Sequence, residues 1–124
     1  MITETTSTLA SRTASLQRQD GRVVCEHLLV AARPLRRLRG LLGRRSLPED
    51  EGILLRPAGS IHTFFMRFPI DVVFLDREGV VVGIEPSLAP WRTAGRRGAK
   101  SVVELASGEC ERRGVSVGDR LLAA

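Results

Sequence analysis

The stretch IDVVFLDREGVVVGIE, residues 70–85, decides the fold class of this chain. Two runs rich in β-branched residues, Ile70–Leu75 and Val80–Glu85, flank the four-residue connection Asp76-Arg77-Glu78-Gly79. A short connection of this kind that ends in glycine, between two β-branched runs, is typical of a β hairpin. The sequence therefore predicts two antiparallel strands joined by a tight turn.

Further strands are predicted on both sides of this hairpin. Pro34–Leu42 is predicted to be a helix, since Pro34 suits a first helical turn and leucines recur at three- and four-residue spacing. A short helical turn is expected near the C-terminus, ended by Gly114. The connections are too short for repeated parallel crossovers, so we expect a mainly β fold: an antiparallel β-sandwich or partly closed barrel with one covering helix. The remaining strands are predicted at Val23–Val30, Gly52–Arg56, His62–Phe65, Ser101–Ala106 and Arg120–Ala123.

The length of 124 residues predicts one domain. Residues 1–19 hold eight Ser or Thr and few large apolar groups, a composition that does not repay the entropy of ordering. We therefore expect a disordered Ser/Thr-rich tail over 1–20 and a single globular domain over 21–124.

Composition also limits the class of protein. No apolar stretch approaches the roughly 20 residues that cross a bilayer, and no N-terminal signal pattern is visible, so we expect a cytoplasmic protein with no membrane contact. Cys25 and Cys110 are then expected to be free thiols. Cys25 and His27 are two residues apart in a predicted strand, so they share one of its faces and could supply two metal ligands. Without a second ligand pair elsewhere we expect no metal and no cofactor.

Three blocks of the sequence carry a resemblance to a known family. HTFFMRFPIDVVFLD at residues 62–76 closely resembles the central signature of the bacterial and archaeal family catalogued as domain of unknown function 192. RLRGLLGR at 37–44 and VELASG at 103–108 are similar to the sections that precede and close it. The resemblance covers about residues 23–122. It implies a compact, mainly β single domain and no particular reaction.

Two carboxylates stand out because they interrupt apolar strands. Asp71 lies among Ile70, Val72 and Val73, and Glu104 lies in a similar strand. A buried carboxylate needs hydrogen-bond donors or a cleft, because an unpaired buried charge costs several kcal/mol. Either the two acids line one pocket, or each is neutralised by backbone amides or an arginine. We expect Arg37 to be the partner of Asp71 in the second case.

Three further residues complete the predicted ligand-binding set. His62 near neutral pH can exchange a proton, bind a ligand or simply pack at a strand end. Met66 follows it in the same motif. Trp91 lies in the long connection over 86–100, whose length is typical of a functional loop. Core packing is the simpler explanation for the phenylalanines, whereas Trp91 could stack on a ligand.

Three functions follow from these residues. The leading one is a binding module that holds a small molecule or peptide in a cleft near His62–Asp71 and the loop over 86–100. The second is nucleic-acid or other polyanion binding, because the formal net charge is +5 and arginines cluster. The third is a hydrolase-like enzyme with His62 and Asp71 or Glu104 as acid and base. The polyanion-binding set would be Arg36, Arg39, Arg92, Arg96, Arg97 and Lys100.

Overall fold

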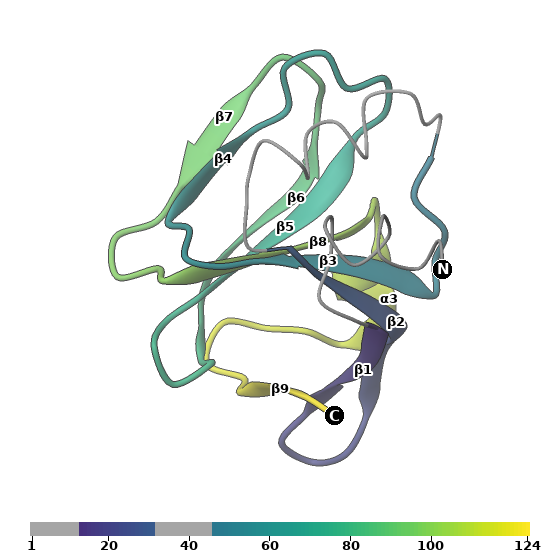
Figure 1. Cartoon of the computed structure of the whole chain (residues 1–124), viewed down its shortest axis with the longest axis vertical. Coiled ribbons are helices and arrows are strands. Elements are labelled where there is room, and N and C mark those ends of the chain that lie inside the picture. The colour runs from purple at the N-terminus through teal and green to yellow at the C-terminus, as the bar shows by residue number, and fades with distance from the viewer. Residues whose placement is uncertain (1–12, 32–45) are drawn as a thin grey trace, which may run out of the picture.

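The computed structural model describes residues 13–31 and 46–124 (Figure 1). Nine strands and one short helix follow one another along these residues. In chain order they are β1 Thr13–Arg18, β2 Val23–Ala31, β3 Glu51–Leu55, β4 Ser60–His62, β5 Ile70–Leu75, β6 Val81–Leu88, β7 Thr93–Gly95, β8 Ser101–Ala106, α3 Glu109–Arg113 and β9 Leu121–Ala123.

Seven strands form one large sheet, and β4 pairs with β7 in a separate small sheet. The order in the large sheet is β6-β5-β8-β3-β2-β1-β9. The predicted hairpin over 70–85 is confirmed as β5 and β6. An isolated bridge between Val80 and Arg120 brings the two edges of the sheet together at one end, without the continuous pairing of a closed barrel. The mainly β fold predicted from the sequence is therefore confirmed.

One pairing departs from the antiparallel expectation. β2 and β3 run parallel, with His27 opposite Glu51 and Val30 opposite Leu54. A parallel pair needs a crossover of a dozen or more residues, and the chain between Ala31 and Glu51 is long enough to provide it. The covering helix predicted at Pro34–Leu42 lies in that connection, outside the described residues.

The prediction of a disordered tail over 1–20 is wrong for residues 13–18. These residues form β1, which pairs with β2 on one side and β9 on the other. Leu16, only 2% exposed, joins the core at this point. The two neighbouring strands provide partners for the backbone hydrogen-bonding groups of a segment whose own composition does not predict order. The helical turn at α3 and its end at Gly114 are confirmed.

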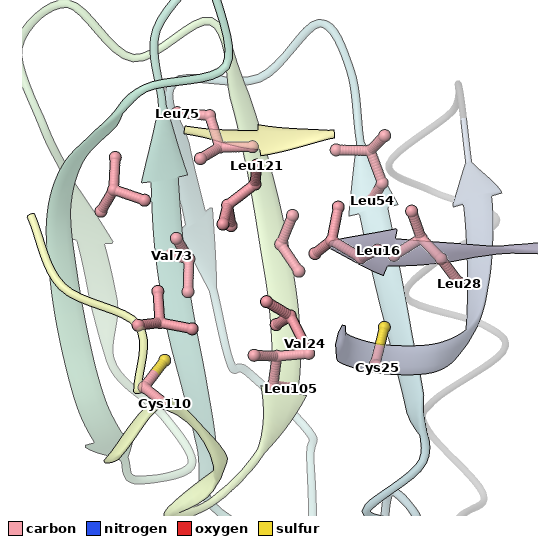
Figure 2. Close-up of a cluster of buried hydrophobic side chains, with 13 residues drawn as sticks. Leu16, Val24, Cys25, Leu28, Leu54, Val73, Leu75, Leu105, Cys110 and Leu121 are labelled. Atoms are coloured by element: carbon pink, nitrogen blue, oxygen red, sulfur yellow. The ribbon is translucent and has the colours of Figure 1, made fainter. Parts of the chain in front are cut away.

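Both faces of the sheet are buried at its centre, because β5 and β8 send alternate side chains into two clusters. The first cluster includes Val73, Leu75 and Leu105, together with residues of β1, β2, α3 and β9 (Figure 2). The second includes Val72 and Phe74 and lies on the other face of the sheet. This explains why the 70–75 segment is apolar at consecutive positions.

Candidate functional site

An exposed group of rings lies where β4 and β7 meet the connections that follow and precede them. The His62 ring stacks on Phe64 with ring centres 4.7 Å apart. Phe64 lies 5.8 Å from Trp91, and Phe65 lies 4.6 Å from the same indole. The exposed fractions are 36% for Phe64, 60% for Phe65 and 55% for Trp91. We call these four residues the aromatic surface.

Thr63 holds the two halves of the aromatic surface together. Its hydroxyl donates to the carbonyl of Ala89 (2.6 Å) and accepts the N–H of Arg92 (2.9 Å). Its backbone N–H donates to the Arg92 carbonyl (2.8 Å), and its carbonyl accepts the Trp91 N–H (3.0 Å). Thr63 itself is completely buried. One side chain therefore fixes the Trp91 loop against the connection that follows β4.

Two of the exposed rings sit on strained backbone. Phe65 has φ of 68° and Trp91 has φ of 65°, both in the left-handed region. For a bulky residue this conformation costs of the order of 1–3 kcal/mol, and such strain is concentrated at binding and active sites. Both side chains are exposed in this conformation, and the hydrogen bonds of Thr63 lie in the same two segments.

The segments that carry the aromatic surface contain no acidic residue. Neither residues 62–69 nor residues 87–100 include Asp or Glu. Arg67, Arg92 and Arg97 are exposed there and form no salt bridge with any residue of the described ranges. Arg96 differs, since it pairs with Glu85 at 3.2 Å. Its guanidinium also donates to the Ile84 carbonyl and lies over the Phe74 ring.

The two buried carboxylates do not share a pocket. In the β5–β8 register Asp71 lies opposite Leu105, and Val72 lies opposite Glu104. Directly opposed residues point to the same face of a sheet and successive residues to opposite faces. Asp71 therefore faces the cluster that contains Leu105, and Glu104 faces the other side. Of the two alternatives that the sequence left open for these acids, the shared pocket is therefore wrong.

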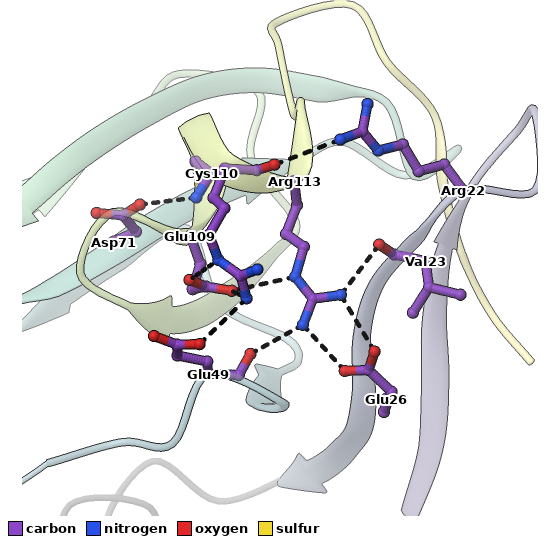
Figure 3. A network of polar contacts seen from close by, with 9 residues as sticks. Arg22, Val23, Glu26, Glu49, Asp71, Glu109, Cys110 and Arg113 are labelled. Carbon is purple, nitrogen blue, oxygen red and sulfur yellow. Dashed lines mark hydrogen bonds and ion pairs between the residues drawn. The ribbon is translucent and has the colours of Figure 1, made fainter.

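Asp71 binds backbone amides. Its two carboxylate oxygens accept the N–H groups of Ser87 (2.8 Å) and Cys110 (2.9 Å), and the second bond is drawn in Figure 3. Asp71 thereby fixes the end of β6 and the start of α3 to β5. The nominated partner Arg37 lies outside the described residues, as do Arg36 and Arg39.

The remaining predicted site residues separate into two groups. His62 and Trp91 are brought together through Phe64 in the aromatic surface. Met66 is 3% exposed and packs in the second core cluster, so it does not contribute to that surface. For the acid–base hypothesis, Nδ1 of His62 accepts the Phe64 N–H at 3.3 Å, and both oxygens of Asp71 are engaged elsewhere. No catalytic pair is built from these two side chains in the described structure.

A second polar network has a structural role (Figure 3). The Arg113 guanidinium bonds Glu109 (3.1 Å) and Glu26 (3.0 Å), which joins α3 to β2. The hydrogen bond from the Arg112 guanidinium is the main cause that lowers the pKa of the Glu109 carboxyl below its ordinary value of 4.5. Burial acts in the opposite direction, and the hydrogen bond from Arg113 lowers the pKa further. These contacts neutralise an acid that is only 3% exposed.

The cysteines are buried thiols. Burial raises the pKa of Cys25 from 9.0 to about 11 and also raises the pKa of Cys110. The predicted free state of both residues agrees with the structure. The His27 side chain is 61% exposed while Cys25 is fully buried, so the two do not face one site. Within 13–31 and 46–124, no group of three or more His, Cys, Asp or Glu is arranged to hold a metal ion.

The sequence predicts His62 and Trp91 as site residues but does not identify three others, namely two rings of the aromatic surface and the threonine that supports it. Core packing, the simpler interpretation of the sequence for Phe64 and Phe65, is wrong for these two exposed rings, and the sequence gives no signal for Thr63. The available signal was the pairing of an acid-free aromatic segment at 62–69 with an acid-free loop at 87–100. Their approach through β4 and β7 depends on long-range pairing that no local pattern shows.

Two archaeal relatives match one half of the chain. A UPF0127 protein of Pyrococcus furiosus is 46% identical over 63 residues, which are 50% of this chain and 53% of the relative. A UPF0127 protein of Pyrococcus abyssi is 43% identical over the same shares of the two chains. This chain thus spans about half the length of these curated relatives.

Two solved structures share the fold. A Sinorhizobium meliloti protein described as a "putative transcription regulator" has a TM-score of 0.76 and 27% identity, over 90% of this chain and 92% of that one. A Novosphingobium aromaticivorans protein of unknown function has a TM-score of 0.74 and 20% identity, over 89% and 83%.

The described part of the chain contains no helix with the length and apolarity needed to span a membrane. The family model described as "Uncharacterized ACR" and known as domain of unknown function 192 matches residues 15–123, nearly the whole described fold. The chain is therefore a member of the domain of unknown function 192 family.

Proposed function

We propose that this protein is a binding module whose aromatic surface takes an apolar peptide segment bordered by acidic residues. The observation that carries the proposal is a group of three exposed rings in which Phe64 and Phe65 both pack against Trp91, next to a buried threonine that links the two segments. Exposed contiguous apolar groups of this kind mark interaction sites on soluble proteins. Trp and Arg are also the residue types that most often dominate binding energy at interfaces.

The charge around the rings defines the chemistry of the partner. Arg67 and Arg92 are exposed on the two segments that carry the aromatic surface, and these segments contain no carboxylate. An acidic flank on the bound peptide would be attracted to these guanidinium groups, whereas a basic flank would be repelled. Apolar residues in the peptide centre would cover Phe65 and Trp91.

The contact between the rings favours a peptide over a single nucleic-acid strand. Strand-binding proteins offer separate ring faces on which successive bases stack. Here the rings of Phe64 and Phe65 both pack against Trp91, so they form one continuous apolar area. Polyanion binding through the full predicted set has less support, because Arg96 is engaged by Glu85 and the Phe74 ring.

The test uses synthetic peptides with a core of Leu and Phe flanked by Asp and Glu, and matched peptides with Lys and Arg flanks. Trp91 is the only tryptophan, so its indole N–H gives one resolved NMR signal that reports directly on the surface. We expect the acidic peptides to shift this signal and the basic ones to leave it unchanged. Trp91→Ala and Phe65→Ala should each weaken binding by about tenfold or more, as hot-spot residues do.

Val117→Ala is the matched control, because Val117 is 64% exposed and lies outside both ring-bearing segments. It should bind the acidic peptides like the parent protein. Equal weakening by the control, or no binding of any acidic peptide to the folded protein, refutes the proposal. Retardation of mixed-sequence DNA or RNA at low salt that Trp91→Ala abolishes would refute it in favour of nucleic-acid binding.

A further inference from the structure

A hollow of about 260 Å³ opens at the end of the first core cluster. Its floor is made by four leucines of β1, β3, β5 and β9, all nearly buried. Figure 2 shows Leu54, Leu75 and Leu121 gathered at the end of this cluster away from Cys110. The floor is therefore apolar. The fourth leucine is Leu16.

The rim of the hollow is cationic. Arg56, Arg77 and Lys100 line it and are all exposed. None of these three side chains forms a hydrogen bond or ion pair with residues 13–31 or 46–124, whereas Arg18 and Arg113 are paired. Three cations around one apolar hollow, unpaired within the described residues, outnumber the single carboxylate of the lining and form a complementary site for an anion.

Asp76 supplies the one carboxylate among the residues that line the hollow, and one of its oxygens is engaged within a turn. Oδ1 of Asp76 accepts the N–H groups of Glu78 (2.8 Å) and Val80 (2.9 Å) within the β5–β6 turn. It therefore stabilises the turn that forms one wall. The backbone of Gly79 completes that wall, and a Cβ atom there would approach the Leu121 carbonyl oxygen to 2.8 Å.

We propose that this hollow binds a small amphipathic carboxylate, with the chain on the leucine floor and the carboxylate among Arg56, Arg77 and Lys100. Guanidinium groups fit a carboxylate through two parallel hydrogen bonds, which favours this head group. A methylene occupies about the volume share of a water molecule, roughly 30 Å³. The hollow thus accommodates a chain of about eight carbons.

This site is separate from the aromatic surface. The rim residue Arg77 follows the last residue of β5, whereas the segment of Phe64 and Phe65 precedes the first residue of that strand. The two proposals therefore rest on different residues and fail independently.

The test titrates the protein with octanoate and follows the methyl signals of Leu54, Leu75 and Leu121 by NMR. Hexanoate, octanoate and decanoate test the size of the hollow. Each added methylene should strengthen binding about fourfold until the hollow is full, after which decanoate should bring no further gain. Octanol and octylamine, which lack the negative charge, should bind at least tenfold more weakly, as should acetate, which lacks the chain.

Variants separate the rim from the floor. The triple variant Arg56→Ala, Arg77→Ala, Lys100→Ala should lower octanoate affinity at least tenfold, and Ala123→Trp should block the hollow. Arg22→Ala is the matched control, since Arg22 is an exposed arginine that is absent from the hollow lining and donates to the Arg112 carbonyl instead. Circular dichroism confirms folding of each variant. Failure of octanoate to shift the floor methyls, equal binding of octanol, or unchanged affinity in the triple variant overturns the proposal.

Discussion

Replacement of Thr63 by valine tests whether one hydroxyl holds the ring-bearing connections together. Valine keeps the shape of the side chain but leaves the Ala89 carbonyl and the Arg92 N–H without the bonds now measured at 2.6 and 2.9 Å. A buried polar group that loses its partner costs about 1–3 kcal/mol. Because Ala89 and Arg92 are exposed residues, water replaces part of the loss, and we expect about 2 kcal/mol in total.

Two probes distinguish local from global effects in this experiment. The fluorescence of the single Trp91 reports the loop, and far-ultraviolet circular dichroism reports the sheet. In urea titrations Thr63→Val should lower the free energy of unfolding and shift native Trp91 emission to the red. A loss of this size lowers the Tm by roughly 8 °C in a domain of this length.

Thr63→Ser is the control, because it keeps the hydroxyl and removes only a methyl group. Serine should retain the native emission maximum and most of the stability. If valine and serine variants unfold at the same urea concentration and share one emission spectrum, the hydroxyl does not hold the loop and the reasoning is wrong.

Three further outcomes follow from buried polar groups. Asp71→Asn should cost about 1–3 kcal/mol in urea unfolding, because the amide group puts its NH₂ against one of the two N–H donors; unchanged stability would contradict this. The Glu109 carboxyl has a folded-state pKa below 4.5, so its stabilisation is complete above pH 4.5 and is lost as the pH falls through the folded value. The stability difference between the parent and Glu109→Gln should shrink correspondingly in acid, and a difference that stays constant down to pH 2 would count against the assignment. Cys25 and Cys110 are buried, and the pKa of Cys25 is raised to about 11, so iodoacetamide at pH 8 should not label either thiol in the folded protein. Both thiols should react once urea unfolds the chain. Rapid labelling of either thiol without urea would show that its site opens in the folded state.

The sequence was sufficient for elements whose pattern is local. The hairpin over 70–85 was predictable because its turn and its β-branched runs lie within sixteen residues. The end of α3 was predictable because Gly114 adopts the left-handed conformation that glycine favours. β1 was not predictable from composition, since its order comes from two partners distant in sequence.

The candidate site was only partly predictable for a similar reason. Asp71 and Glu104 were recognised as unusual, but which face each occupies depends on the β5–β8 register. Phe65 was expected in a strand, and its φ of 68° places it in a turn instead. That conformation depends on hydrogen bonds between Thr63 and a loop almost thirty residues later.

The pairing of β1 with β9 has a kinetic consequence. Leu16 and Ala123 are more than a hundred residues apart, so this contact closes the longest loop in the sheet, at a high entropic cost. We expect the folding nucleus to form around the β5–β6 hairpin and its neighbour β8, with the terminal strands joining after the rate-limiting step. Truncation of Leu121 to alanine should then accelerate unfolding and leave the refolding rate almost unchanged.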